Sequence, residues 1–263
     1  MKTPRICAFI AVRMKSKRLP KKALANIEGY TALERVINNI KPSKFVDEII
    51  IATSTNKQDD VIVKLAKDKG IPYFRGDKDN VIKRYFDASE KFKTDIIVRV
   101  TGDCPLMSFE IIDYLIKEHL KQNADFTSLD NNRIPIGTFP EIINSLALKK
   151  LMSLDIDLSY SEYMTFYFIN NPELFSINIV PCNQKKFIRP NYRMTLDYPE
   201  DLEFFRVLFQ ELGSQDKAIP LRESIEFLDN NPEIAHINKD QPLKWKEDAD
   251  LIKKLNNITK YNQ

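Results

Sequence analysis

The feature that most constrains the fold is a repeated alternation between short, continuous apolar runs and helical patterns. The runs at 6–12, 49–51 and 96–100 are dominated by apolar residues, and each is followed by a segment with helical periodicity. Strands this apolar are buried on both faces, which is typical of a parallel sheet covered by helices. We therefore expect an α/β, Rossmann-like fold with a mostly parallel sheet and helices on both faces.

Local signals place the helices and the remaining strands. Thr31 and Glu34 have the spacing of a capping box, and Gly70 suits the end of a helix over 58–68. Hydrophobic periodicity predicts further helices and strands along the chain. The helices are expected at 80–92, 109–121, 199–212 and 221–228, and the strands at 71–74, 175–180 and 192–196.

The alternation is interrupted once, in the middle of the chain. Residues 131–190 carry several turn-forming Asn, Pro and Gly residues, and the regular pattern returns only at about 192. We expect one domain over 1–241 with a small inserted lobe at about 131–190. The polar, Lys-rich stretch at 242–263 is expected to be a peripheral helix or tail.

Composition narrows the class of protein. The net charge of +3 over 263 residues is too small to indicate a nucleic-acid partner, and no apolar run is long enough to span a bilayer. With six glycines and no Gly-rich phosphate motif, phosphate binding would depend on side chains. Three widely spaced cysteines favour a reducing, cytoplasmic setting, and the two histidines are expected to be packed or on the surface.

A basic loop follows the first predicted strand. Six of the ten residues at 13–22 are Lys or Arg, including Arg13 and Lys22. In open α/β sheets, ligands bind at the carboxyl ends of the strands, so this loop lies where a triphosphate could meet several positive charges. A solvated basic loop is the alternative, and composition alone leaves both interpretations open.

Two aspartates have a similar relation to predicted strands. Asp103 follows the strand at 96–100, and Asp197 follows the strand expected at 192–196. Two carboxylates at one sheet edge could hold Mg²⁺ for phosphoryl chemistry. A plain turn at 101–105 and a helix N-cap at Asp197 are the competing interpretations.

Four segments stand in order along the chain, at 11–22, 74–85, 98–106 and 196–203. Together they resemble the signatures of sugar-acid cytidylyltransferases. The chain looks most like the spore coat polysaccharide biosynthesis type, SpsF, and more distantly like CMP-acylneuraminate and CMP-KDO synthetases. The resemblance implies a GT-A-like nucleotidyltransferase fold, CTP as substrate, Mg²⁺ as cofactor and a homodimer.

The resemblance also implies roles for individual residues. Arg13, Lys22, Asp103 and Asp197 would be catalytic, with both aspartates holding the metal. Glu162 and Thr165 would lie on the acceptor side. The nucleotide would be bound by Ala11, Arg13, Ser16, Lys17, Arg18, Lys22, Arg75, Gly76, Arg84, Thr101, Gly102 and Asp103.

The chain departs from the family pattern mainly in its middle. Ser161 and Tyr163 replace an Arg and a His, and 136–141 departs from a segment usually rich in Asp. The implied reaction joins CMP to an acidic sugar such as a nonulosonic acid, and these departures leave the acceptor open. A polyol phosphate or phosphonate acceptor, a nucleotide-sugar glycosyltransferase of the same fold, and a nucleotide-binding protein without activity are the alternatives.

Overall fold

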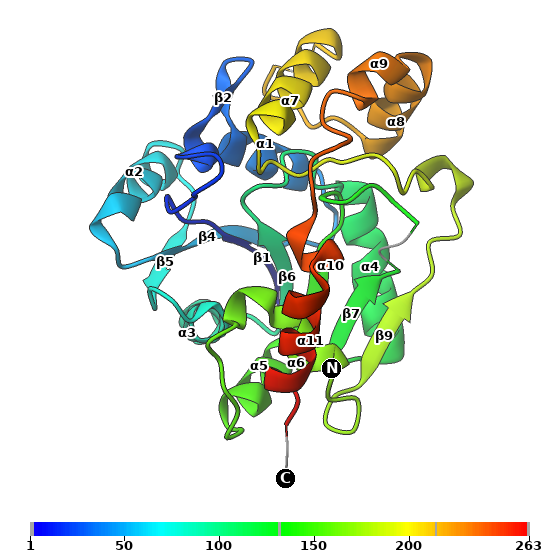
Figure 1. Cartoon of the computed structure of the whole chain (residues 1–263). Helices are drawn as coiled ribbons and strands as arrows, with labels where there is room; N and C mark the ends of the chain where they lie inside the picture. Colours follow the sequence, from blue (N-terminus) through cyan, green and yellow to red (C-terminus); the bar gives the residue numbers. More distant parts are fainter. Residues whose placement is uncertain (1–2, 131–132, 214, 262–263) are drawn as a thin grey trace.

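A single seven-stranded sheet forms the centre of the molecule (Figure 1). The computed structural model describes residues 3–130, 133–213 and 215–261. The strand order is β5-β4-β1-β6-β8-β7-β9, and β8 alone among these strands runs against its neighbours. The strands are β1 (Ile6–Ala11), β4 (Glu48–Ser54), β5 (Tyr73–Gly76), β6 (Ile96–Thr101), β7 (Phe126–Leu129), β8 (Glu141–Asn144) and β9 (Ile177–Val180). The expected mostly parallel α/β sheet is confirmed.

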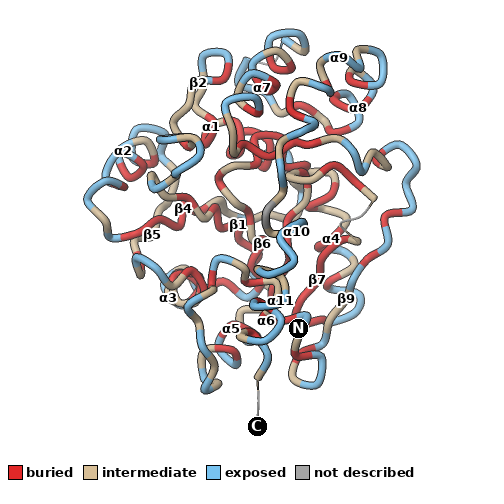
Figure 2. The backbone as a smooth tube through the Cα atoms, viewed as in Figure 1, coloured by how far each residue is buried: buried red, intermediate tan, exposed pale blue. Residues whose placement is uncertain are grey.

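Helices cover both faces of this sheet because the central strands are apolar on both sides. In β1, Ala8 and Ile10 belong to one buried core, whereas Cys7 and Phe9 belong to the other. Figure 2 shows the buried backbone running through the middle of the molecule. The first core is covered by α1 (Ala32–Ile40), α2 (Asp60–Asp68), α4 (Phe109–Gln122), α7 (Pro199–Glu211) and α8 (Leu221–Asn230), and the second by α3 (Val81–Phe92), α5 (Ser145–Met152) and α6 (Met164–Ile169).

The predicted helix signals are confirmed at the atomic level. The Thr31 hydroxyl accepts from the Glu34 backbone N–H at 3.2 Å, and the Glu34 carboxylate accepts from the Thr31 N–H at 2.7 Å. This capping box begins α1. Gly70 follows the end of α2 with a φ of +64°, a left-handed conformation that favours glycine.

Two of the predicted strands need correction. The strand expected at 71–74 forms instead at Tyr73–Gly76, where the backbone pairs with β4. The strand predicted at 192–196 is wrong, because this stretch makes a single β-bridge between Arg193 and Ile136. Its remaining backbone hydrogen bonds go to loops, including Leu196 N–H to the Asp103 carbonyl at 2.8 Å.

The middle of the chain joins the same sheet. The segment for which we expected an inserted lobe supplies β8 and β9 as well as α5, the short 3-10 helix η3 (Ser161–Tyr163) and α6. Sequence reasoning missed β7, β8 and α5. It also missed the small hairpin β2 (Asn26–Ile27) and β3 (Tyr30–Thr31), and the 3-10 helix η1 (Lys22–Leu24).

The C-terminal stretch lies across the front of the molecule in Figure 1. After α9 (Pro232–Ala235) the chain passes to α10 (Lys244–Glu247) and α11 (Ala249–Ile258). α11 is fastened to the end of α6, where the Asn171 amide donates to the Thr259 carbonyl at 2.8 Å. Among the described residues, no helix combines the length and apolar character needed to cross a membrane.

Candidate active site

The basic loop follows the carboxyl end of β1, and the side chain of Asp59 holds its backbone. The Met14 backbone N–H donates to the carboxylate of Asp59 at 2.8 Å, and Ser54 at the end of β4 donates to the same carboxylate. Asp59 is fully buried. Sequence reasoning missed this residue, because it reads as part of the first turn of a solvent-facing helix.

Arg13 lies at the start of the loop and makes two contacts. Its guanidinium donates to the Lys78 carbonyl at 2.9 Å and forms an ion pair with the Glu162 carboxylate. The resemblance assigns Arg13 to the nucleotide and Glu162 to the acceptor, and in the structure these two residues contact each other. Farther along the loop, Ser16 is half-buried and Lys17 is exposed.

Lys22 connects the two predicted metal carboxylates. Its ammonium lies 2.7 Å from an Asp103 oxygen and 2.9 Å from an Asp197 oxygen. Burial alone would lower the pKa of Lys22, but the two carboxylates outweigh it and raise the pKa. Burial would likewise raise the pKa of Asp103, and the charge of Lys22 reverses this and lowers it. Asp103 and Asp197, which come from segments far apart in the chain, thus meet at one ammonium.

Asp197 is held by a buried network that the sequence did not reveal. The fully buried Asp201 accepts from the Asp197 backbone N–H at 2.8 Å and from the Tyr198 N–H at 2.9 Å. Arg193 donates to both Asp201 oxygens at 2.7 and 3.0 Å, and Asn238 donates to Asp201 at 2.9 Å. Tyr198, not Asp197, is the N-cap of α7, so the competing N-cap interpretation fails and the Asp197 side chain faces the site.

Arg18 is a second loop cation, after Lys22, that pairs with Asp197. It donates to Asp197 at 2.7 Å, and its guanidinium lies 4.9 Å from the centre of the Tyr198 ring. Burial would lower the pKa of Arg18, but the Asp197 carboxylate and the Tyr198 hydroxyl raise it overall. The basic loop is therefore not simply solvated, since three of its cations pair with carboxylates from other elements.

The ends of β1 and β6 meet closely at Ala11 and Gly102. The Gly102 N–H donates to the Ala11 carbonyl at 2.9 Å, and a Cβ at position 102 would lie 2.8 Å from Cβ of Val12. Glycine is required there by this approach. Thr101 precedes it and lies 3.2 Å from the sulfur of Cys104.

A second polar cluster joins β6, β8, η3 and α6. Arg99 of β6 forms an ion pair with Glu141 of β8 at 2.6 Å and donates to the Glu162 carbonyl at 3.1 Å. Thr165 donates to Glu141. Sequence reasoning singled out Thr165 and Glu162 but missed Arg99, whose place inside an apolar run was a usable signal for a partnered buried charge.

Arg75 and Arg84, which the resemblance assigns to nucleotide binding, donate hydrogen bonds to backbone carbonyls. Arg84 is buried and donates to the Asp77 carbonyl at 2.7 and 3.0 Å, while a Cβ at Gly76 would lie 2.9 Å from Cγ of Arg84. Arg75 donates to the Ser54 carbonyl at 3.1 Å and pairs with Asp60 at 2.7 Å. Both residues thus shape the loops at the ends of β4 and β5.

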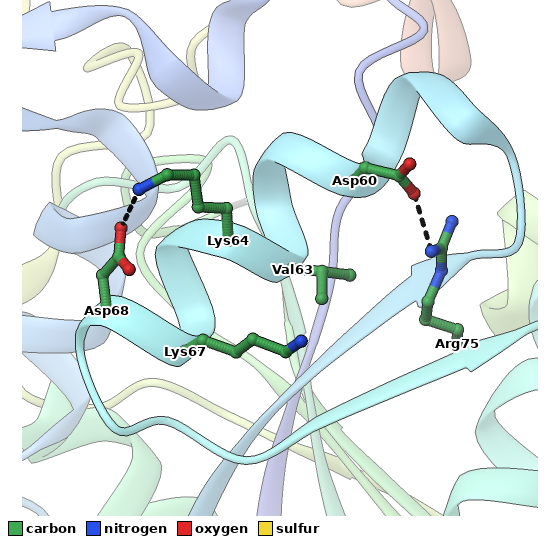
Figure 3. A pocket seen from close by; sticks show the side chains of 6 residues that line it. All are labelled: Asp60, Val63, Lys64, Lys67, Asp68 and Arg75. Atoms are coloured by element: carbon green, nitrogen blue, oxygen red, sulfur yellow. Dashed lines mark hydrogen bonds and ion pairs between the residues drawn. The ribbon is translucent and has the colours of Figure 1, made fainter.

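Arg75 also borders an open hollow of about 330 Å³ between α2 and β5. Figure 3 shows two ion pairs at its ends, Asp60 with Arg75 and Lys64 with Asp68, and Lys67 between them. These charges are largely satisfied within the hollow. The hollow contains none of the carboxylates that face Lys22.

The donor set at Lys22 suits a divalent cation. Mg²⁺ in proteins is commonly held by one or two carboxylates together with phosphate oxygens. Here two carboxylates already accommodate the positive charge of Lys22 between them. No group of three or more His, Cys, Asp or Glu side chains suited to a metal occurs among the described residues, so phosphate oxygens would complete the shell.

Comparison with known proteins agrees with this geometry. The family model described as Cytidylyltransferase matches residues 7–226, which is most of the chain. The chain belongs to the cytidylyltransferase family. The cytidylyltransferase is therefore a nucleotidyltransferase that uses CTP, as its sequence signatures implied.

The matches to individual relatives extend over most of the length of the cytidylyltransferase. It is 31% identical to the spore coat polysaccharide biosynthesis protein SpsF of Bacillus subtilis, covering 88% of this chain and 96% of that one. It is 35% identical to the uncharacterized protein MJ1063 of Methanocaldococcus jannaschii, covering 89% and 94%. A solved cytidylyltransferase from Leptospira borgpetersenii matches with a TM-score of 0.82 and 29% identity, covering 92% and 99%.

Proposed function

We propose that the cytidylyltransferase transfers CMP from CTP to an acidic sugar, such as a nonulosonic acid, for surface polysaccharide or glycan biosynthesis. The observation that carries the proposal is the ammonium of Lys22 between Asp103 and Asp197, with Arg18 beside it. This arrangement offers cations for phosphates and carboxylates for a metal at one sheet edge. The printed name of the SpsF relative supports the polysaccharide context.

The proposed reaction is an in-line substitution at phosphorus. An acceptor oxygen attacks the α-phosphorus of CTP, the new O–P bond forms, and the bond to the β-phosphate oxygen breaks to release pyrophosphate. Arg13 and Lys22 would bind the phosphates and stabilise the charge that develops on the leaving pyrophosphate. Because the loop is fixed by Asp59 and the sheet, these charges are positioned before substrate binds.

Asp103 and Asp197 would hold Mg²⁺. When bound, this metal supplies charge neutralisation for the phosphates and lowers the pKa of an acceptor hydroxyl. Asp201 would keep Asp197 in place by accepting its backbone N–H, and Arg193 would do so through its ion pair with Asp197 at 3.4 Å. Of the other implied nucleotide residues, Ala11, Ser16, Lys17, Thr101 and Gly102 would lie along the nucleotide, and Arg75, Gly76 and Arg84 would shape the loops beside it.

Substituting Asp103→Asn tests the assignment of the metal carboxylates. We expect kcat with CTP and Mg²⁺ to fall on the order of 10²-fold or more, since a preorganised charge at the reacting phosphate is lost. Asp155→Asn is the matched control, because Asp155 is an exposed aspartate on the segment after α5. Near-full activity of the Asp103 variant would refute the assignment.

A pyrophosphate-release screen tests the nucleotide and the acceptor together. Four nucleoside triphosphates would be offered with nonulosonic acids, KDO, polyol phosphates and phosphonates. The proposal predicts release with CTP and a sugar acid. Release with a polyol phosphate or phosphonate would replace the proposed acceptor, and binding of nucleotide sugars without pyrophosphate release would indicate a glycosyltransferase.

The acceptor is proposed to bind at the segment that departs most from the family signatures. Glu162 and Thr165 lie there, near Arg99 and Glu141. Substituting Thr165→Val should raise the acceptor KM more than the CTP KM. Equal effects on both substrates would argue against an acceptor role.

We also propose a homodimer in a reducing, cytoplasmic compartment. Three large apolar side chains of the middle segment are exposed, namely Leu146, Ile169 and Ile179. All three cysteines are free and buried, as expected where disulfides do not form. Sedimentation equilibrium of the wild type and of Leu146→Glu would test the interface, and a monomeric wild type would refute the dimer.

A further inference from the structure

The three paired cations of the basic loop are not equally available to a phosphate. Lys22 and Arg18 face Asp103 and Asp197, whose side chains are 26% and 14% exposed. Arg13 faces Glu162, whose side chain is 55% exposed. Ion pairs with a solvent-exposed partner contribute little to stability, so the pair of Arg13 with Glu162 is the easiest of the three to exchange.

The backbone of Glu162 is fixed although its carboxylate is exposed. Arg99 donates to the Glu162 carbonyl at 3.1 Å. The neighbouring Ser161 is fully buried, and its hydroxyl accepts from the Val81 N–H at 2.9 Å. The carboxylate can therefore leave Arg13 by side-chain rotation alone, without moving η3.

Arg13 stays in place when Glu162 leaves. A second guanidinium nitrogen donates to the Lys78 carbonyl at 2.9 Å. The loop that carries this carbonyl is held by the buried Arg84, which donates to Asp77 and Lys78 carbonyls. Loss of the ion pair would thus expose a positioned cation at the carboxyl end of β1.

We propose that Glu162 occupies the phosphate position at Arg13 in the free enzyme and that the triphosphate of CTP displaces it. This inference rests on the proposed function, since it assumes that Arg13 binds a phosphate of CTP. Glu162 then acts as an internal competitor. It lowers the affinity for CTP and shields Arg13 from weakly charged anions, which cannot outcompete a carboxylate that is held nearby.

The test is the affinity of the Glu162→Gln variant for CTP, measured by isothermal titration calorimetry. Glutamine keeps the size of the side chain and the backbone carbonyl that accepts from Arg99, but it removes the competing charge. We expect CTP to bind roughly two- to fivefold more tightly, the equivalent of a surface ion pair of about 1 kcal/mol or less. Damage to the fold would weaken binding, so tighter binding separates competition from a structural role.

Two controls make the result specific. Glu173→Gln removes the same charge from an exposed position just after α6, and its CTP affinity should equal that of the wild type. In an Arg13→Gln background, the Glu162→Gln substitution should no longer tighten binding, because the competitor acts through Arg13. Glu162→Ala is a second variant that also retains the backbone carbonyl and should show the same gain.

The outcomes distinguish this inference from the proposed function. Unchanged or weaker CTP binding in both Glu162 variants would overturn the inference, as would an equal gain in the Arg13→Gln background. Failure of the wild type and of every variant to bind CTP would overturn the proposed function itself.

Discussion

The carboxylate of Asp201 accepts the backbone N–H of Asp197 at 2.8 Å from a fully buried position. Asp201 also binds Arg193, whose side chain is 5% exposed. The orientation of a candidate metal ligand therefore depends on a residue four positions later that does not itself face the substrate. This contact explains how Asp197 can be placed accurately although it follows an irregular segment.

Substituting Asp201→Asn should both destabilise the enzyme and impair catalysis. Arg193 would lose its buried counterion, which is expected to cost about 3 kcal/mol in the free energy of unfolding. Urea unfolding and kcat with CTP would measure the two effects. Glu203→Gln, an exposed site on the same helix, should change neither, and wild-type stability of the Asp201 variant would contradict the assigned role.

Removing the ammonium of Lys22 should change metal binding in the absence of CTP. In Lys22→Met, the Asp103 and Asp197 carboxylates no longer share a cation, so Mg²⁺ should bind roughly tenfold more tightly, about 1.4 kcal/mol. CTP should bind more weakly because a phosphate partner is lost. Calorimetric titration with Mg²⁺ alone checks the first effect, and Lys15→Met in the same loop should resemble the wild type. Unchanged metal affinity would show that Lys22 and the metal do not compete.

The buried His119 should make stability depend on pH. Burial lowers its pKa to about 4 from an ordinary value of 6.5, and its ring lies 2.9 Å from the Thr127 hydroxyl. Because the pKa of His119 is lower in the folded than in the unfolded protein, the folded state favours the neutral ring. The contribution of His119 to the free energy of unfolding is therefore full above pH 6.5 and is lost as the pH falls toward 4. Between pH 7 and pH 5 the free energy of unfolding should drop by roughly 2 kcal/mol from this group.

Urea unfolding at the two pH values checks the effect of His119. His119→Gln lacks the titrating group, so its stability should change less than that of the wild type over the same interval. The same slope in both proteins would place the pH dependence elsewhere, for example in the carboxylates.

Glu141 should be coupled energetically to Thr165. Glu141→Gln leaves Arg99 without its buried counterion, at an expected cost of about 3 kcal/mol, whereas Thr165→Val loses one hydrogen bond, about 1 kcal/mol. Since both substitutions break the same contact, the double variant should be less destabilised than the sum. Urea unfolding of the four proteins completes the cycle, and strict additivity would mean that the contact contributes nothing.

Short-range patterns were sufficient for much of the fold. The continuous apolar runs predicted β1, β4 and β6, because only strands covered on both faces bury every side chain. The capping box at Thr31 and the glycine at position 70 predicted helix ends, because both act within a few residues. The missed β7 and β8 depend on pairing with distant strands, which no local pattern encodes.

In the candidate site, too, some features follow from local sequence and others only from the tertiary structure. The sequence by itself determined that Arg13 follows β1 and Asp103 follows β6, and that Lys22 and Asp197 lie in segments that resemble cytidylyltransferase signatures. Tertiary structure alone decided that Lys22 lies between the two aspartates, that Asp201 positions Asp197, and that Glu162 covers Arg13. These contacts join residues from separate elements, most of them far apart in the chain. Charge pairing acts through space, so it appears only when the sheet and its loops bring those elements together.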